Sequence, residues 1–464
     1  MRVDGLRIFL GLLLVTVVST PFVKAQGIAQ SLSPGGEAQP DGFRIYTISL
    51  YGVYSSTTLP FGSGLAALST PQAFGSGGTT APNYLAGIIG SIGWRKTGAR
   101  TTAFVNYTPS YDASVRYFTA NSMNNSLTFG VDRELAPKWT LTVGGVAMTA
   151  RWNQFLLAPT LFGSIVGTPT TIDDLISGLL AGKYTNGQLA SILTGAPQIE
   201  SPGASLLYGT RLFDSALHTG ISYAKSPRLT LRGDITGTRV QHLNSGDTPG
   251  NKIFLVPVTT TASASLGATY AFSPFTFLDF DATSSRVFSR FTDEYVSNAT
   301  VSVAKVLGRR LIVQVRGGAG IITPVRQTFR IKPGPHYLAG TTLTYKTLSH
   351  TFMGSFDHTI TDTYGLGATS ASVGSGAWSW HLPGRRWSVS TMGRYEFLEN
   401  LSGHSLNAWL ANAGLMRLLE SHTMVRVGYF YGRTSGVLQG ILSNRPIQGA
   451  ELVFSFSPQQ PFGM

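Results

Sequence analysis

Residues 217–238 alternate apolar and polar side chains with a period of two on both sides of a tight central turn. On the second arm, Leu231 and Ile235 share one face, while Arg232 and Asp234 share the other. Successive side chains of a strand point to opposite sides, so this pattern predicts a β-hairpin with one apolar and one polar face. Such hairpins, repeated along a chain, can close into a barrel with an apolar outside and a wet interior.

The same alternation recurs along most of the chain in segments of about 10 residues, the length a tilted strand needs to cross a bilayer. It predicts an all-β fold, an antiparallel up-and-down transmembrane β-barrel of about 18 strands, within a range of roughly 16–18. The expected strands are residues 43–54, 84–94, 101–108, 127–135, 139–152, 204–224, 228–240, 259–272, 276–288, 295–307, 311–321, 337–347, 351–361, 369–381, 387–397, 405–418, 423–433 and 446–456.

The connections between these strands alternate between short and long. Short turns are expected at residues 134–138, 225–228, 273–274, 308–310, 347–350, 382–386 and 419–422, with longer loops between them. A transmembrane barrel has short periplasmic turns at one rim and long external loops at the other, whereas soluble sandwiches and propellers have no reason to alternate in this way. An even number of strands also places both ends of the barrel at the short-turn rim.

Aromatic residues recur at both ends of the apolar faces. Two aromatic rows about one strand apart are typical of a bilayer with two interfaces, although aromatic residues also favour strands in soluble cores. Beside the short turns they are Trp94, Trp139, Tyr223, Phe272, Tyr345 and Trp387, and at the other strand ends Tyr54, Tyr107, Tyr395, Phe397, Tyr429 and Tyr431.

The composition agrees with a membrane barrel and excludes several other classes. Of 464 residues only 12% are charged, about half the share usual in soluble proteins. The absence of Cys excludes disulfides, thiolate metal sites and a lipoprotein anchor. The formal net charge is +13, but the basic residues are scattered singly without a Lys/Arg stripe, so we expect no nucleic-acid partner.

The chain divides into one large domain with short flanking segments. Residues 1–25 combine Arg2 and Arg7 with an apolar run too short to span a bilayer, which predicts a cleaved signal peptide and export from the cytoplasm. Residues 26–42 are expected to form a flexible periplasmic lead, residues 43–456 the barrel, and residues 457–464 a C-terminal tail.

The last predicted strand carries a resemblance to a known class. With Gly449, Leu452, Phe454 and Phe456 it resembles the closing strand of Gram-negative outer-membrane β-barrels of the porin type, and the likeness extends over residues 43–456. In that class the aromatic residue usually ends the chain, whereas residues 457–464 follow here. The resemblance implies a place in the bacterial outer membrane among lipids and lipopolysaccharide, insertion by the barrel-assembly machinery, and a homotrimer as one oligomeric option.

The connection at residues 153–203 is the longest. Asp173 and Asp174 suit the first turn of a short helix, and Lys183 follows a run of apolar residues at helical spacing. In general porins the third external loop folds into the barrel, so the resemblance implies that these three residues belong to a constriction. An external lid or a partner-binding patch is the alternative.

Charged residues of both signs fall on the predicted inner faces. They would set the field inside a pore, or else pair across strands and hold the wall together. The pore-lining candidates are Arg232, Asp234, Asp279, Asp281, Arg316, Asp357, Arg394, Glu396 and Arg426, and Asp132 and Glu451 share the inner face.

The polar inner face predicts a porin-like channel for passive diffusion of small hydrophilic solutes. The alternatives are a gated transporter or receptor for a specific ligand, with a hydrophobic ligand as one option, and a barrel with a structural or surface-binding role. We expect no enzyme, because no His lies in a recognisable nucleophile motif and no metal-spaced His/Glu cluster is present. No cofactor or metal is therefore expected.

Overall fold

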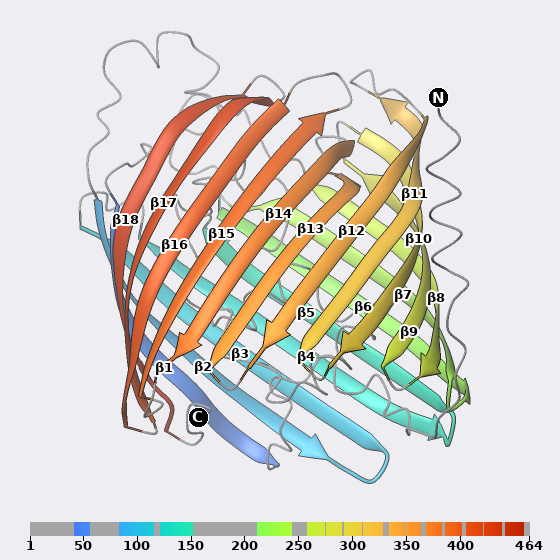
Figure 1. Cartoon of the computed structure of the whole chain (residues 1–464), viewed down its shortest axis with the longest axis horizontal. Helices are drawn as coiled ribbons and strands as arrows, with labels where there is room; N and C mark the ends of the chain where they lie inside the picture. The colour runs from blue at the N-terminus through green and yellow to red at the C-terminus, as the bar shows by residue number, and fades with distance from the viewer. Residues whose placement is uncertain are drawn as a thin grey trace.

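The computed structural model describes residues 41–55, 83–115, 121–151, 211–243, 258–273, 275–289, 292–308, 310–327, 334–347, 349–362, 368–382, 386–400, 405–420, 422–438 and 441–458. They form a single closed sheet of 18 tilted strands (Figure 1). The strands are β1 Gly42–Ser55, β2 Asn83–Thr97, β3 Thr101–Ser114, β4 Ser122–Ala136, β5 Trp139–Arg151, β6 Arg211–Ser226, β7 Leu229–His242, β8 Thr259–Ser273, β9 Thr276–Phe288, β10 Thr292–Leu307, β11 Leu311–Gln327, β12 Gly334–Lys346, β13 His350–Asp362, β14 Ala368–His381, β15 Trp387–Asn400, β16 Ser405–Glu420, β17 Thr423–Leu438 and β18 Ile441–Phe456.

Each strand pairs antiparallel with the next along the chain, and β1 pairs with β18 to close the barrel. At this seam the hydroxyls of Ser49 and Ser455 lie 2.8 Å apart. The Ser457 hydroxyl donates to the carbonyl of Tyr46 at 2.7 Å, so the residue after the last strand is tied to the first. The predicted transmembrane β-barrel and its 18 strands are therefore confirmed.

The apolar faces point outward, as the alternation predicts. Around the barrel the large apolar residues on one parity are exposed, for example Phe129 at 36%, Val131 at 40% and Val427 at 52%. The aromatic residues follow the same rule: Trp94, at the short-turn end of β2, is 40% exposed, and Tyr429, in β17, is 52% exposed. A closed sheet with an apolar outer belt satisfies its backbone hydrogen bonds internally, which a bilayer requires.

The aromatic row at the short-turn rim is denser than predicted. Trp378 and Trp380 of β14 stack on His350, with ring centroids 6.1 and 5.8 Å apart. Phe352 packs beside Trp378, at 6.2 Å. These residues add an aromatic surface where strands meet the predicted interface.

Two expectations about lengths need correction. The strands have 13 to 17 residues, longer than the expected 10 or so, because they extend beyond the apolar belt at both rims. Some connections at the far rim are also short: only residues 439–440 separate β17 from β18, and residues 289–291 separate β9 from β10. Alternating short and long connections therefore describe the first half of the barrel better than the second.

The flanking segments lie largely outside the described residues. This holds for the predicted signal peptide, for most of the lead at residues 26–42 and for most of the tail. Gly42, expected to end the lead, begins β1 instead. Among the described residues no helix is long and apolar enough to cross a membrane.

Candidate functional site: the charged inner wall

The inner wall of the barrel is polar because the outward positions take the apolar side chains. In β9, Phe280 is 45% exposed on the outside, and its neighbours Asp279 and Asp281 point the other way. In β4, Val131 faces outward while Asp132 is only 3% exposed. The same alternation directs these buried polar residues inward: Ser49, Ser91, Asn106, Asp112, Asp132, Thr142, Ser222, Ser302, Thr342, Ser379, Asn412 and Ser455.

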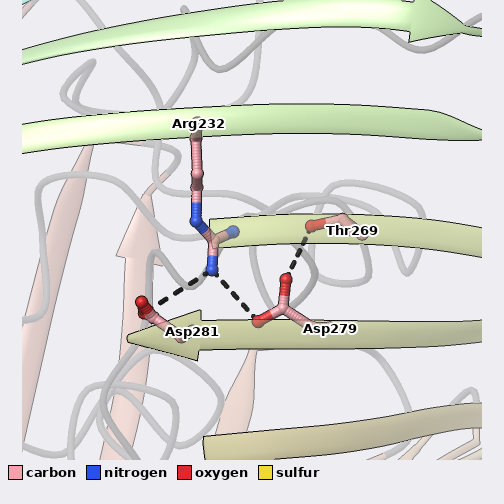
Figure 2. A network of polar contacts seen from close by, with 4 residues as sticks. All are labelled: Arg232, Thr269, Asp279 and Asp281. Atoms are coloured by element: carbon pink, nitrogen blue, oxygen red, sulfur yellow. Dashed lines mark hydrogen bonds and ion pairs between the residues drawn. The ribbon is translucent and has the colours of Figure 1, made fainter. Parts of the chain in front are cut away.

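Arg232 is the centre of the largest charged cluster on this wall. From β7 its guanidinium reaches across β8 to β9, where Nη2 lies 3.0 Å from Asp279 Oδ2 and 3.8 Å from Asp281 Oδ2 (Figure 2). The Thr269 hydroxyl donates to Asp279 Oδ1 at 2.6 Å. Three neighbouring strands are thus joined by one polar network, which holds Arg232 in a single position.

Asp234 adds a third carboxylate to this region. It lies two residues along β7 from Arg232 and is hydrogen-bonded to Ser265 of β8. Asp281 is close enough to interact electrostatically with both Asp279 and Asp234. Arg316 of β11 also acts on Asp281, so with Asp357 this region holds two arginines and four carboxylates and is negative overall.

The other candidate arginines also contact carboxylates. Arg316 of β11 forms a salt bridge with Asp357 of β13. Arg394 and Glu396, both in β15, are 3.7 Å apart. Arg426 Nε of β17 lies 3.4 Å from Glu451 Oε1 of β18. The nine pore-lining candidates thus face inward, and all four arginines among them belong to ion pairs.

Glycines on the inner wall make these long contacts possible. Gly267 separates Arg232 from Asp281 in the same cross-strand row, and a Cβ there would lie 2.3 Å from Arg232 Nε. Likewise a Cβ at Gly340 would lie 2.9 Å from Asp357 Oδ1. A glycine within a strand commonly marks such a close approach. In a sequence, an ion pair that reaches across an intervening strand is therefore indicated by a glycine at an inward position of that strand, with opposite charges on the strands to either side.

Replacing Gly267 with valine should therefore displace Arg232 from Asp279. Because the obstructed atoms, Nε, Cγ and Cζ of Arg232, belong to a flexible side chain and not to the backbone, we expect a moderate loss of about 1–2 kcal/mol in unfolding free energy. Urea unfolding of the refolded barrel measures it. Gly237→Val in β7 is the matched control, since nothing lies within 4 Å of its Cβ position. Equal stabilities of the two variants would show that the Arg232 contact contributes nothing.

Acidic residues are concentrated on one side of the barrel. From β3 to β10 the described inward side chains include one arginine, Arg232, against many carboxylates. From β11 to β18 the three inward arginines face Asp357, Glu396 and Glu451. The carboxylates of the first side are Asp112, Asp132, Asp214, Asp234, Asp279, Asp281 and Glu294. We call this side, β3 to β10, the acidic sector.

Neutral hydrogen-bond donors hold two carboxylates of the acidic sector. The Thr142 hydroxyl donates to Asp132 Oδ1 at 2.8 Å. Asn124 Nδ2 donates to Asp112 Oδ2 at 3.0 Å, and the Tyr51 hydroxyl also donates to Asp112. Hydrogen bonds from neutral groups position a carboxylate without cancelling its charge. Within the described part of the inner wall, the acidic sector therefore carries more carboxylates than arginines.

The remaining sequence candidates cannot be placed. Asp173, Asp174 and Lys183 lie outside the described residues, as does the whole segment 153–203. Among the residues that are described, no group of three or more His, Asp or Glu side chains could hold a metal ion.

Comparison of the sequence with known protein families and with curated proteins finds no match. Among solved structures, the Pseudomonas aeruginosa protein OccK2 (OpdF) is similar at 10% identity, with 90% of this chain and 100% of that chain covered and a TM-score of 0.46. P. aeruginosa OpdK, solved with vanillate, is 11% identical over 89% of this chain and 98% of that one, with a TM-score of 0.43. Function is therefore inferred from the residues of this chain.

Proposed function

We propose that this chain is a porin-like channel of the bacterial outer membrane, through which small hydrophilic solutes diffuse passively. The observation that carries the proposal is a closed barrel of 18 strands with an apolar outer belt and a polar, charged inner wall. Barrels of 16–18 strands are wide enough to leave an aqueous lumen. Passive diffusion needs no chemical step, so no catalytic residue or cofactor belongs to the proposal.

The placement in the membrane is part of the same proposal. The rim that carries the short turns faces the periplasm, and residues 1–25 direct export and are then removed. Barrel-assembly machinery would insert the chain beside lipopolysaccharide, and a homotrimer is one arrangement the outer belt allows. A band shift between heated and unheated samples on a gel tests the barrel in a native membrane fraction.

Solute flux tests the channel directly. Liposomes that contain the refolded chain should swell in small uncharged sugars and swell more slowly as sugar size increases, because the lumen sieves by size. Deleting residues 170–195 should preserve or increase this flux. If that deletion instead abolished selective uptake of one ligand, the protein would be a gated transporter. No swelling with either form would indicate a structural barrel.

The acidic sector should make the pore prefer cations. Replacing Asp234, Asp279 and Asp281 together with asparagine leaves Arg232 without carboxylates beside it, so the cation-to-anion permeability ratio should fall roughly several-fold. The reversal potential in a salt gradient measures the ratio. Glu399→Gln removes an exposed acid from the outer face of β15 and serves as the control. An unchanged ratio in the triple variant would contradict a role of these residues in the conduction path.

A further inference from the structure

An apolar groove crosses the outer surface of the barrel. Its volume is about 920 Å³, and it runs over β6 to β12. Small residues form the floor, since Ala282 of β9, Ala299 of β10 and Ala319 of β11 lie in one cross-strand row. Leu266 and Ile321 rise beside them as walls. We call it the alanine groove.

The alanine groove faces the membrane and not the lumen. Its walls carry the outward parity: Leu266 is 68% exposed, and Ile235, which also lines it, is 69% exposed. The two hydroxyls near the floor, from Ser284 and Ser297, lie 2.9 Å apart and hydrogen-bond to each other. These two hydroxyls satisfy each other, and the walls beside them are apolar, which suits a hydrocarbon chain.

Three arginines lie at one end of the alanine groove. Arg286 follows Ser284 by two residues on the same face of β9. The next cross-strand row runs from Arg239 of β7 through β8 and β9 to Asp293 of β10 and Arg326 of β11. In this row Asp293 is paired directly with Arg326. All three arginines are exposed. We call Arg239, Arg286 and Arg326 the arginine rim.

Among the described residues, Asp293 is the carboxylate that lies beside the arginine rim. Asp293 accepts two hydrogen bonds from Arg286, both 2.9 Å long. Its position holds Arg286 over the ring of Tyr295, at 5.5 Å from the ring centre. Three arginines against one aspartate leave a net positive charge, and guanidinium groups bind phosphate with paired hydrogen bonds. The charge complements an anionic headgroup.

The position of the arginine rim along the barrel axis determines which membrane leaflet the headgroup would occupy. The arginine rim lies near the β9–β10 connection at residues 289–291. This connection is at the end of the barrel opposite the short turn between β8 and β9. In the orientation proposed above, that rim faces the cell exterior. The headgroup would therefore belong to the outer leaflet, where phosphorylated glycolipids replace phospholipids.

We propose that the alanine groove and the arginine rim together bind one molecule of lipid A, with an acyl chain in the groove and the phosphate groups along the arginine rim. The inference rests on the membrane orientation in the proposed function and adds a defined lipid site. It requires both parts of the site, since an acyl chain alone would not distinguish lipid A from any other lipid.

Native mass spectrometry of the refolded chain, titrated with bisphosphorylated lipid A in detergent, tests the site. Ala282→Leu with Ala299→Leu fills the groove, and Arg286→Gln with Arg326→Gln removes most of the rim charge. Each pair should weaken binding roughly tenfold, as losing one or two good contacts would. Ala413→Leu and Arg433→Gln, at outward positions on β16 and β17, are the matched controls and should leave binding unchanged.

The headgroup is tested by changing the lipid. Monophosphorylated lipid A should bind more weakly than the bisphosphorylated form, and phosphatidylglycerol more weakly still. Equal binding of phosphatidylglycerol, or equal binding by the groove and control variants, would overturn the proposal. A change of oligomeric state in the groove variant, with lipid binding unaltered, would assign the groove to a second copy of the chain.

The two proposals fail separately. Liposome swelling assays on the same variants measure solute flux through the pore. This flux should be unchanged, because neither pair of substitutions touches the inner wall. Specific lipid A binding without solute flux would refute the channel and leave the lipid site standing. Normal flux with no preference for lipid A would refute the site alone.

Discussion

Replacing Gly449 with valine should prevent the barrel from closing. Gly449 of β18 lies opposite Ser55 of β1, at the seam between the first and last strands. A Cβ at this position would lie 2.1 Å from the Tyr54 carbonyl oxygen and 2.4 Å from Phe430 Cζ. A backbone atom cannot move aside as the end of a side chain can, so strand pairing at the seam must shift. We expect a loss of more than about 3 kcal/mol in unfolding free energy.

The measurement is the folded fraction after refolding in detergent, followed by urea unfolding of what folds. Gly52→Val places the same side chain on β1, where nothing lies within 4 Å, and should fold like the unaltered chain. If Gly449→Val folded as completely as Gly52→Val, the seam between β1 and β18 would differ from the one described.

Replacing Arg232 with methionine should destabilise the barrel strongly. The side chains of Arg232 and Asp279 are only 13% and 19% exposed. Without the guanidinium, Asp279, Asp281 and Asp234 would be left close together with no positive charge between them. Removing one partner of a buried ion pair typically costs about 3–5 kcal/mol, and the partial exposure here reduces the expected loss to about 2–3 kcal/mol.

The same network predicts that second-site substitutions restore the stability lost in Arg232→Met. Adding Asp279→Asn and Asp281→Asn to Arg232→Met removes the repulsion, so most of the lost unfolding free energy should return. A urea unfolding series over the single, double and triple variants gives the coupling energy. If the triple variant were no more stable than Arg232→Met, the loss would come from packing and not from charge.

The period of two and the short turns were enough to predict the strands. All 18 expected segments overlap the observed strands, because burial on one face and water on the other select opposite residue types at alternate positions. Their ends were predicted less well. Strand length was inferred from bilayer thickness, and the backbone pairing continues past the apolar belt, as at β17 and β18.

The same alternation predicted which charged residues face inward, and the structure places Arg232, Arg316, Arg394 and Arg426 there. It could not predict their partners. Pairing depends on the register between strands, which is shifted by irregularities such as those at Ala224/Ser226 and Ala271/Ser273. Arg232 reaches β9, beyond its neighbouring strand, because Gly267 leaves room, and that requires the register to be known.

The arginine rim could not be inferred from any one segment either. Arg239, Arg286 and Arg326 are far apart in the sequence, and only Arg326 lies in a locally basic segment, with Arg330 and Lys332. They lie at the same level on the outer surface because cross-strand rows join β7, β9 and β11 through the intervening strands. The net basic charge of the chain therefore indicates a particular binding surface only once the strand pairing is known.

Single-channel conductance of refolded residues 26–464 in a planar bilayer tests the central claim most directly. A water-filled lumen with an acidic sector predicts steady ohmic steps, and a reversal potential of the sign for cation preference when a salt gradient is applied. Silence from protein shown to be folded and inserted would contradict the channel, and anion preference would contradict the part assigned to the acidic sector.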